Sequence, residues 1–351
     1  MKKYTPFALT LFALPMCVSA FFVKYQNRQR YRILFGAALL VCASVFIGCG
    51  KQDKPPAVAD TGKISVVTTI FPPYDFTRAV TGGKAEITML LPPASESHSF
   101  EPRPQDIVKI QKSDVFIYTG GESDEWVKEI LKSIDAPKLK VVTLMECVET
   151  VEEDIVEGMQ KEEEDGNEGG KGEEGPEYDE HVWTSPRNAK LITRKISETL
   201  REVDSANADA YRKNTEAYLS QLDELDAKFK GVVDGAARKT IVFGDRFPFR
   251  YFADAYGLKY FAAFPGCATE TEASAKTVAF LIDKMKKETI PVVFHIELSN
   301  EKMAQTIGEA TGAKARLLHA CHNVTKADFE AGKTYVDFMT ANVETLREAL
   351  K

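Results

Sequence analysis

The sequence is poor in histidine and contains no recognisable hydrolase motif. Only five of its 351 residues are histidine, and neither HExxH nor GxSxG occurs, although these patterns mark zinc proteases and serine hydrolases. Apart from one acidic segment, the chain after residue 48 is close to neutral, with no basic face of the kind that binds nucleic acid. These absences argue against an enzyme of those classes and against a nucleic-acid-binding protein.

Two apolar stretches, residues 4–23 and 33–48, precede the globular part and flank a basic segment. The second stretch has the order of a bacterial lipoprotein signal, with an apolar core and small residues before Cys49. Residues 1–48 are interpreted as a leader, Cys49 as the lipidation site and residues 49–63 as a lipidated flexible tether. The alternative is an uncleaved membrane anchor that begins at Tyr4. In both cases the body is exported.

From residue 64 onward, strand-like and helix-like blocks alternate. This order predicts an α/β fold with two lobes, each a mainly parallel sheet covered by helices. The lobes are expected over residues 64–184 and 238–351, joined by a linker helix over 185–232 with Ser205–Asn207 as a candidate interruption. Strands are expected at residues 64–70, 86–91, 114–120, 139–144, 239–244, 258–264, 291–298 and 314–320.

One segment carries most of the negative charge. Residues 151–180 contain fourteen Asp or Glu and two Lys, whereas the rest of the chain after residue 48 has a formal charge near −1. Glycines and like charges predict a disordered loop over about 151–179. The loop is interpreted either as a weak collector of cations near a binding cleft or as a solvated loop with no part in binding.

Two histidines lie in loops suited to metal binding. His98 is on a proline-flanked connection between a strand-like run and a helix expected to begin at Pro104. His181 lies directly before a helix opened by Ser185 and Pro186. An imidazole fixed at a strand end or before a helix is well placed to ligate a metal ion.

The segments around both histidines resemble one protein family. SHSFEPRPQD (97–106) is similar to the PHxxEPxP segment, and DEHVWTSPRNA (179–189) to the DPHxWxSPxNA segment, of zinc and manganese solute-binding proteins of bacterial ABC transporters. Residues 68–93 and 332–350 resemble the same family, so that the resemblance runs from about Ile64 to the C-terminus. It implies a monomeric, lipid-anchored extracytoplasmic receptor with a long rigid linker helix, which delivers Zn²⁺ to an ABC permease.

The resemblance implies two further ligands from the second lobe. In GDRFPFRYFADAYGL (244–258) the family's histidine or glutamate position falls on Arg246, which stays protonated and cannot ligate a metal. Asp245 is the nearest substitute, with helix capping or a salt bridge to Arg246 as its alternative role. The family's last ligand, an aspartate, falls on His319, with His322 as the close competitor. Glu297 is a candidate to support a ligand by hydrogen bonding.

The expected site is therefore His98, His181 and His319, completed by Asp245 or water. Three imidazoles and at most one carboxylate favour Zn²⁺, with Mn²⁺ less favoured because its sites in the family are richer in carboxylates. His295 alternates with strand residues and is interpreted as a core or supporting histidine. Affinity is expected to fall as the pH drops through about 6.5, where histidine takes up a proton.

Three cysteines remain in the exported body. Cys267 and Cys321 both follow strand-like runs of the second lobe, and some members of the family carry a disulfide in this lobe, so a bridge between them is expected. Cys147 would then be a buried single thiol. In the alternative interpretation, Cys321 stays free as a soft metal ligand.

The expected activity is binding and release without chemistry. The alternative from another class is an exported zinc metallohydrolase, in which the metal activates a water molecule at an open position. A manganese-specific member and a surface adhesin of the same fold are further alternatives.

Overall fold

The computed structural model of the chain describes residues 62–160, 177–268 and 272–351, all of which belong to one unit. The predicted leader, Cys49 and nearly all of the predicted tether lie outside these residues. None of the helices within the described ranges combines the length and the apolar character needed to span a bilayer.

The first lobe holds a parallel sheet with the order β2-β1-β3-β4. Its strands are β1 Ser65–Thr68, β2 Glu86–Met89, β3 Val115–Tyr118 and β4 Lys140–Thr143. Its helices are α2 Phe71–Thr81, α3 Pro104–Lys112 and α4 Glu125–Ser133, with 3₁₀ turns at Glu122–Asp124 and Met145–Cys147. Each strand predicted in this lobe is present.

The second lobe repeats the same order, as β6-β5-β7-β8, again with parallel pairing throughout. Its strands are β5 Thr240–Phe247, β6 Lys259–Pro265, β7 Val292–His295 and β8 Lys314–Leu317. Its helices are α7 Arg250–Tyr256, α8 Ala275–Glu288, α9 Lys302–Thr311, α10 Lys326–Glu330 and α11 Tyr335–Ala349. The predicted fold class, two α/β lobes with parallel sheets, is confirmed.

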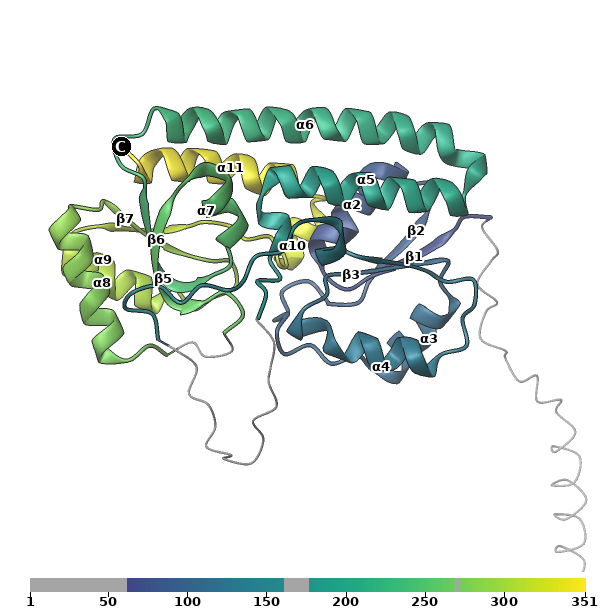
Figure 1. Ribbon diagram of the computed structural model, residues 1–351, viewed down its shortest axis with the longest axis horizontal. Coiled ribbons are helices and arrows are strands. Elements are labelled where there is room, and N and C mark those ends of the chain that lie inside the picture. Colours follow the sequence, from purple (N-terminus) through teal and green to yellow (C-terminus); the bar gives the residue numbers. More distant parts are fainter. Residues whose placement is uncertain (1–61, 161–176, 269–271) are drawn as a thin grey trace, which may run out of the picture. The chain divides into compact units, whose positions relative to one another are not determined.

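Neighbouring strand residues point to opposite faces of each sheet and so enter different cores. In the first lobe, Val66 joins a core that continues into the second lobe, whereas Val67 packs against α3 and α4. In the second lobe, Phe243 joins that same shared core, whereas Val242 packs in a separate core with α8 and α9. Figure 1 shows the shared side of both sheets beneath a layer of long helices. One continuous core therefore joins the two lobes.

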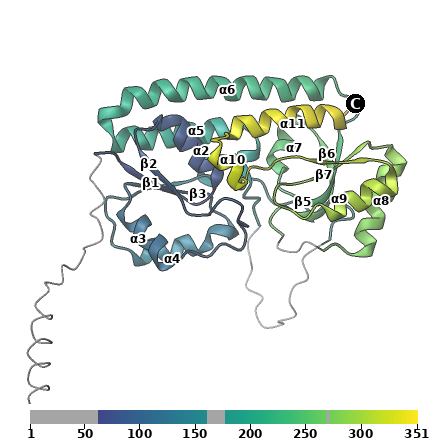
Figure 2. The same ribbon diagram turned by 180° about the vertical axis from the view of Figure 1, so that it is seen from behind.

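The segment between the lobes is a helical hairpin: the linker helix predicted over 185–232 is broken at Ser205–Asn207, its candidate interruption. The 3₁₀ turn Val182–Thr184 leads into α5 (Pro186–Val203), whose C-cap is Asp204. A second 3₁₀ turn (Ser205–Asn207) then leads into α6 (Ala208–Asp234). The Asp204 carboxylate accepts hydrogen bonds from Asn207 Nδ2 at 2.8 Å and from the Tyr211 hydroxyl at 2.6 Å, which stabilises the turn. Helix α6 lies along α5 and reaches over both sheets (Figures 1 and 2).

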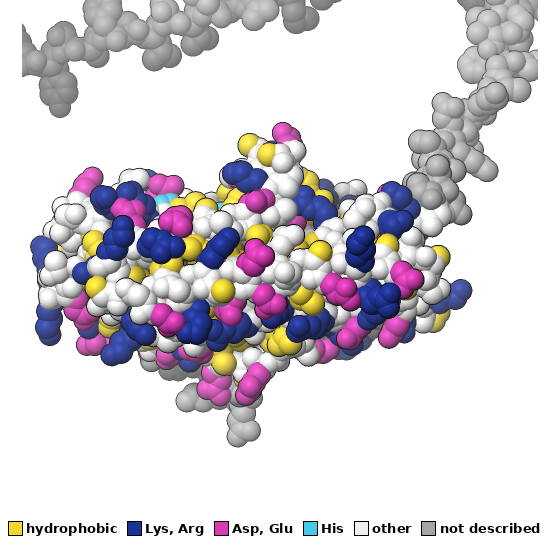
Figure 3. Space-filling view, turned by 90° about the horizontal axis from the view of Figure 1, so that it is seen from above, with side chains coloured by type: hydrophobic (Ala, Val, Ile, Leu, Met, Phe, Trp, Pro, Cys, Tyr) yellow, Lys and Arg dark blue, Asp and Glu magenta, His cyan; other side chains and the backbone are white. Residues whose placement is uncertain are grey.

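The outer face of this helical layer carries both signs of charge. Figure 3 shows Lys and Arg interleaved with Asp and Glu across the face seen from above. Two of these pairs join the arms of the hairpin, Arg187 with Asp226 and Lys190 with Asp223. The pairs are solvent-exposed, so each contributes at most about 1 kcal/mol to stability.

Both ends of the acidic segment are ordered, which corrects the prediction of a disordered loop over about 151–179. Residues 151–160 cross to the second lobe, where the Gln160 N–H donates to the Ala263 carbonyl at 2.9 Å. The Cys267 N–H donates to Glu153 Oε1 at 3.0 Å. On the returning side, Tyr178 forms an antiparallel bridge with Glu152. Residues 161–176 lie outside the described ranges.

Candidate metal centre

Three histidines from distant parts of the sequence meet at one point between the sheets. His98 comes from the loop after β2, His181 from the residue before the 3₁₀ turn that leads to α5, and His322 from the loop after β8. One nitrogen of each ring lies within 4.8 Å of the other two. The ring centroids are 4.5 Å apart for His181 and His322, 5.4 Å for His98 and His322, and 5.7 Å for His98 and His181.

The Nε2 atoms of all three rings are buried and have no hydrogen-bond partner. A buried polar atom without a partner costs on the order of 1–3 kcal/mol, so three of them at one point need an explanation. Neutral imidazole nitrogens with free lone pairs are ligands for zinc and other transition metals. The residues present therefore fit a divalent metal ion held by three imidazoles.

The opposite nitrogen of each ring, Nδ1, faces an oxygen of the protein. His98 Nδ1 is 3.0 Å from Ser123 Oγ, and this hydroxyl in turn donates to Glu180. His181 Nδ1 is 3.0 Å from Asp179 Oδ1. His322 Nδ1 is 3.7 Å from Glu297 Oε1. Contacts of this kind orient metal-binding histidines and select the tautomer that leaves Nε2 free.

Burial sets the charge of the groups around the cluster. It lowers the pKa of His98 and His181 well below the ordinary histidine value, and the neighbouring His322 ring acts in the same direction. Burial also raises the pKa of Asp179 to about 7 and that of Glu180 to about 8. The His98 and His181 rings are therefore neutral at neutral pH, which is the form that binds a metal.

The loop after β8 is shaped around Glu297. Its carboxylate accepts the backbone N–H of Ala320 at 2.7 Å and of His322 at 2.8 Å. Between them Cys321 adopts a φ of 64°, a left-handed conformation that turns the chain sharply. Burial alone would raise the pKa of Glu297, but the adjacent His319 and His322 rings and the donated N–H groups outweigh it and lower the pKa to about 2. Glu297 thus fixes the direction of the His322 side chain.

Hydrogen bonds tie this loop to the first lobe and to the linker. Asn323 Nδ2 donates to the carbonyls of Pro92 at 2.8 Å and Ser95 at 2.9 Å, in the loop that carries His98. Trp183 Nε1 donates to the Ala320 carbonyl at 2.8 Å. The loops that carry the three histidines are therefore bonded to one another directly.

The structure places His319 away from the cluster, although the sequence favoured it over His322. The His319 ring stacks on Phe338 with centroids 4.1 Å apart, and its Nδ1 accepts the Cys321 N–H at 3.0 Å. The left-handed turn at Cys321 separates the two rings, so that only His322 joins His98 and His181. His295 Nδ1 lies 3.1 Å from the Ile296 carbonyl, at the end of β7.

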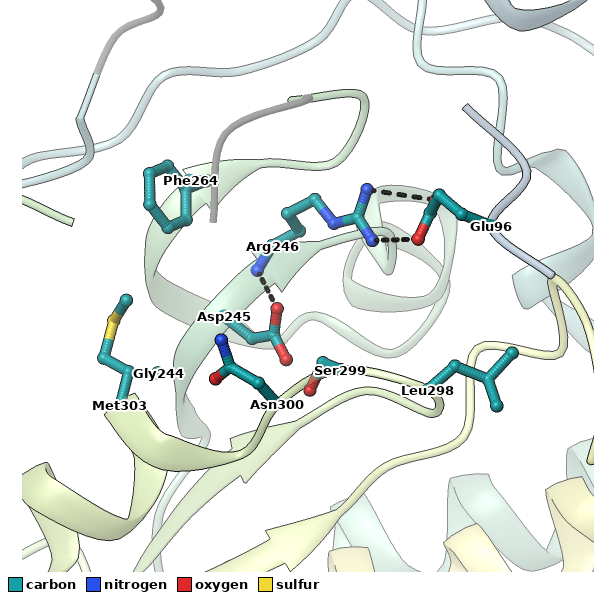
Figure 4. A pocket seen from close by; sticks show the side chains of 9 residues that line it. All are labelled: Glu96, Gly244, Asp245, Arg246, Phe264, Leu298, Ser299, Asn300 and Met303. Atoms are coloured by element: carbon teal, nitrogen blue, oxygen red, sulfur yellow. Dashed lines mark hydrogen bonds and ion pairs between the residues drawn. The ribbon is translucent and has the colours of Figure 1, made fainter. Parts of the chain in front are cut away.

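Asp245 is also absent from the cluster. Its carboxylate accepts the N–H of Arg246 at 2.8 Å and of Ile296 at 3.1 Å, so it joins β5 to the residue after β7, which is neither the helix cap nor the salt bridge considered as its alternative. The Arg246 guanidinium pairs with Glu96, with Nη2 and Oε2 3.2 Å apart. Figure 4 shows this pair at one side of a cavity of about 220 Å³.

The predicted disulfide between Cys267 and Cys321 is wrong, because both thiols are free, as is that of the half-buried Cys147. Cys267 follows β6 and Cys321 follows β8, the two edge strands of the second sheet. Cys267, Glu180 and His181 form a second group with ligand atoms within 4.8 Å, which shares its histidine with the first.

The chain was compared with known families. The model of the family described as "Zinc-uptake complex component A periplasmic" matches residues 66–349, which include all three histidines. The chain belongs to this family. This match covers nearly all of both lobes and the hairpin between them.

Individual relatives support the same grouping. The chain is 30% identical over 308 residues to the zinc-binding lipoprotein AdcA of Streptococcus pneumoniae strain R6, covering 88% of this chain and 59% of that protein. The chain thus spans little more than half the length of this relative. It is 29% identical over 318 residues to the high-affinity zinc uptake system protein ZnuA of Bacillus subtilis strain 168, covering 90% of this chain and 97% of that protein.

Solved structures of relatives have the same fold. The Zn(II)-bound ZnuA-like domain of S. pneumoniae AdcA superimposes with a TM-score of 0.68 at 28% identity, over 82% of this chain and 99% of that one. The metal-dependent lipoprotein YcdH of B. subtilis gives a TM-score of 0.69 at 28% identity, over 82% of this chain and 100% of that one.

Sequence reasoning did not find several residues that build the centre. Ser123 and Glu180 support His98, Asn323 joins two of the loops, and Glu96 holds Arg246. Gly266 also went unnoticed, although a Cβ there would lie 3.0 Å from the His181 ring. Glu180 was detectable, because it is the acid directly before His181; the others are revealed only by the folded chain.

Proposed function

We propose that this protein is an extracytoplasmic receptor that binds one Zn²⁺ ion through the Nε2 atoms of His98, His181 and His322. The observation that carries the proposal is the convergence of three buried Nε2 atoms without partners. Each ring is backed at Nδ1 by an oxygen of the protein, as is usual for histidines that bind zinc. Binding, without chemistry, is the activity that this arrangement supports.

The donor set favours zinc over other divalent ions. Imidazole suits zinc and copper, whereas calcium, magnesium and manganese prefer oxygen-rich shells. Asp245, the carboxylate expected to complete the site, accepts two backbone N–H groups instead. With one carboxylate fewer than expected, the centre discriminates more strongly against Mn²⁺. The names of AdcA and ZnuA as zinc-binding and zinc-uptake proteins agree with this choice.

The bound ion would be delivered to an ABC permease of the same uptake system. The family description, a component of a zinc-uptake complex, supports such a partner. Attachment to the membrane through lipidated Cys49 would keep the receptor beside the permease, and the lipoprotein names of AdcA and YcdH support this. The chain would act as a monomer on the outer side of the membrane. The family match does not favour the metallohydrolase alternative.

The proposal is tested by metal analysis of the full chain and by competition titration with Zn²⁺ and Mn²⁺. We expect one tightly bound zinc per chain, weaker manganese binding, and loss of zinc from His98→Ala and His181→Ala. In cells, deletion of the gene should lower zinc uptake, and Cys49→Ser should release the protein from the membrane fraction. A folded wild-type chain that binds neither metal would refute the receptor function.

A further inference from the structure

Arg246 and Glu96 form an ion pair across the two lobes, next to the histidine cluster. Arg246 is on β5 of the second lobe, and Glu96 is on the loop of the first lobe that carries His98. The guanidinium makes two contacts with the carboxylate, at 3.2 and 3.4 Å, and a third with the Ala268 carbonyl at 3.2 Å. The Arg246 side chain is only 9% exposed, whereas that of Glu96 is 46% exposed.

Glu96 also shapes the loop that carries His98. Its Oε1 accepts the backbone N–H of Ser97 at 3.2 Å and that of His98 at 3.4 Å. The carboxylate that holds Arg246 therefore also holds the backbone at His98. Displacing Glu96 would loosen the loop at the histidine itself.

The pair stands between two cavities. On one side is the cavity of about 220 Å³, lined by Glu96, Arg246 and residues of the second lobe (Figure 4). On the other is a small cavity of about 20 Å³, lined by the same two side chains together with His98, His322 and Glu297. A volume of this size holds one water molecule. Glu96 and Arg246 thus separate the cluster from the larger cavity.

We propose that the Glu96–Arg246 pair is a gate that closes the metal centre in place of a fourth protein ligand. The inference rests on the proposed zinc site, and it adds how the ion's coordination is completed and how the ion is released. Zinc prefers four ligands, and three imidazoles leave one position. Arg246 cannot fill this position, because its guanidinium stays protonated. Glu96 does not fill it either, because its carboxylate is paired with Arg246. The fourth ligand is therefore one water molecule in the small cavity. Opening the pair frees the His98 loop and lets the ion leave through the larger cavity.

The first test measures zinc release from the loaded full chain into excess chelator by stopped-flow mixing. We expect Arg246→Ala and Glu96→Ala each to speed release about tenfold or more, because loss of either side chain removes the contact that holds the His98 loop against β5. The double variant should release no faster than the quicker single variant, since either change opens the same gate. Glu348→Gln, a paired carboxylate of the second lobe that does not touch the first, is the control and should match wild type.

Arg246→Lys and Glu96→Gln serve as milder versions if an alanine variant fails to fold, which the melting curve of the metal-free protein reports. Release rates that equal wild type in folded variants would overturn the gate while leaving zinc binding intact. Absence of zinc binding in the folded wild-type protein would instead overturn the proposed function, and the gate with it.

The second test identifies the fourth ligand with Co²⁺ in place of Zn²⁺. If that ligand is water, azide should replace it and shift the visible absorption bands of the wild-type complex. The Glu96→Ala complex should have the same spectrum as wild type before azide is added. A wild-type spectrum that ignores azide but changes on Glu96→Ala would make Glu96 a ligand and overturn the gate.

Discussion

The two lobes share one strand order but contribute differently to the metal centre. Both sheets are parallel and run in the equivalent orders β2-β1-β3-β4 and β6-β5-β7-β8. The first lobe with its linker presents His98 and His181, whereas the second presents His322 and turns a cation, Arg246, toward the first. Equivalent topology brings loops from both lobes to one place, but the residues on each loop decide whether it binds a metal or closes the site.

The largest effect is expected in the loop after β8, which holds two histidines three residues apart. Substituting each of them tests which one the second lobe contributes to the metal centre. We expect His322→Ala to weaken zinc binding more than about a hundredfold, because loss of a ligand should exceed the 10–100-fold cost of losing a supporting contact. His319→Ala should change affinity less than about threefold, since its ring packs on Phe338. Competition titration measures both, and the reverse order would restore His319 as the ligand.

Substitution of Glu297 tests whether the loop after β8 must be held in shape for His322 to bind zinc. Glu297→Ala removes the acceptor for the N–H groups of Ala320 and His322 and should lower zinc affinity about 10–100-fold. Glu297→Gln keeps one acceptor oxygen and should lie between the alanine variant and wild type. Equal affinity in all three proteins would mean that His322 is held by other contacts.

The shared core can be compared with the surface of the same hairpin. Leu222 on α6 is fully buried in the core that joins the lobes, whereas Leu191 on α5 is 44% exposed. We expect Leu222→Ala to lower the free energy of unfolding by about 2–5 kcal/mol. Leu191→Ala should lower it by less than about 1 kcal/mol. Urea unfolding followed by tryptophan fluorescence and circular dichroism measures both, and a small effect at Leu222 would argue against one continuous core.

The smallest effect is expected at a carboxylate far from the centre. Hydrogen bonds from Arg316 and Lys314 lower the pKa of Glu348 to about 2. A folded pKa below the unfolded one stabilises the protein above about pH 4.5, and this contribution is lost as the pH falls toward 2. Glu348→Gln should therefore lower the free energy of unfolding at pH 7 by less than about 1 kcal/mol, because the carboxylate is partly exposed. Thermal melting of the variant and of wild type measures this difference. The difference should shrink on acidification; a constant difference would exclude this linkage.

Much of the fold was predictable because its elements are locally encoded. The β-branched runs gave the strands, and prolines and glycines marked helix ends, as at Gly82 after α2. The linker was predicted as one long helix from its helical apolar spacing, with Ser205–Asn207 as a candidate interruption. It breaks at Asp204, where contacts with Asn207 and Tyr211 make a turn that apolar spacing does not reveal.

The candidate site was predictable in part. The loops of His98 and His181 stand out by their flanking prolines, whereas the choice between His319 and His322 depends on one left-handed residue, Cys321. The start of the acidic segment was predicted to be disordered from the glycines and like charges of the whole segment. Its order comes from contacts with the second lobe, such as that of Gln160 with Ala263, residues more than a hundred positions apart in sequence.

The sequence by itself determined the alternation of strands and helices, the two-lobe α/β class and the loops that carry histidine, because these follow from spacing and turn chemistry between near neighbours. Only the tertiary structure decided which histidines meet, that the thiols of Cys267 and Cys321 are free, and that Arg246 pairs with Glu96. Each of these depends on the distance between residues far apart in the chain, and that distance is set by how the two sheets and the helical hairpin pack around their common core.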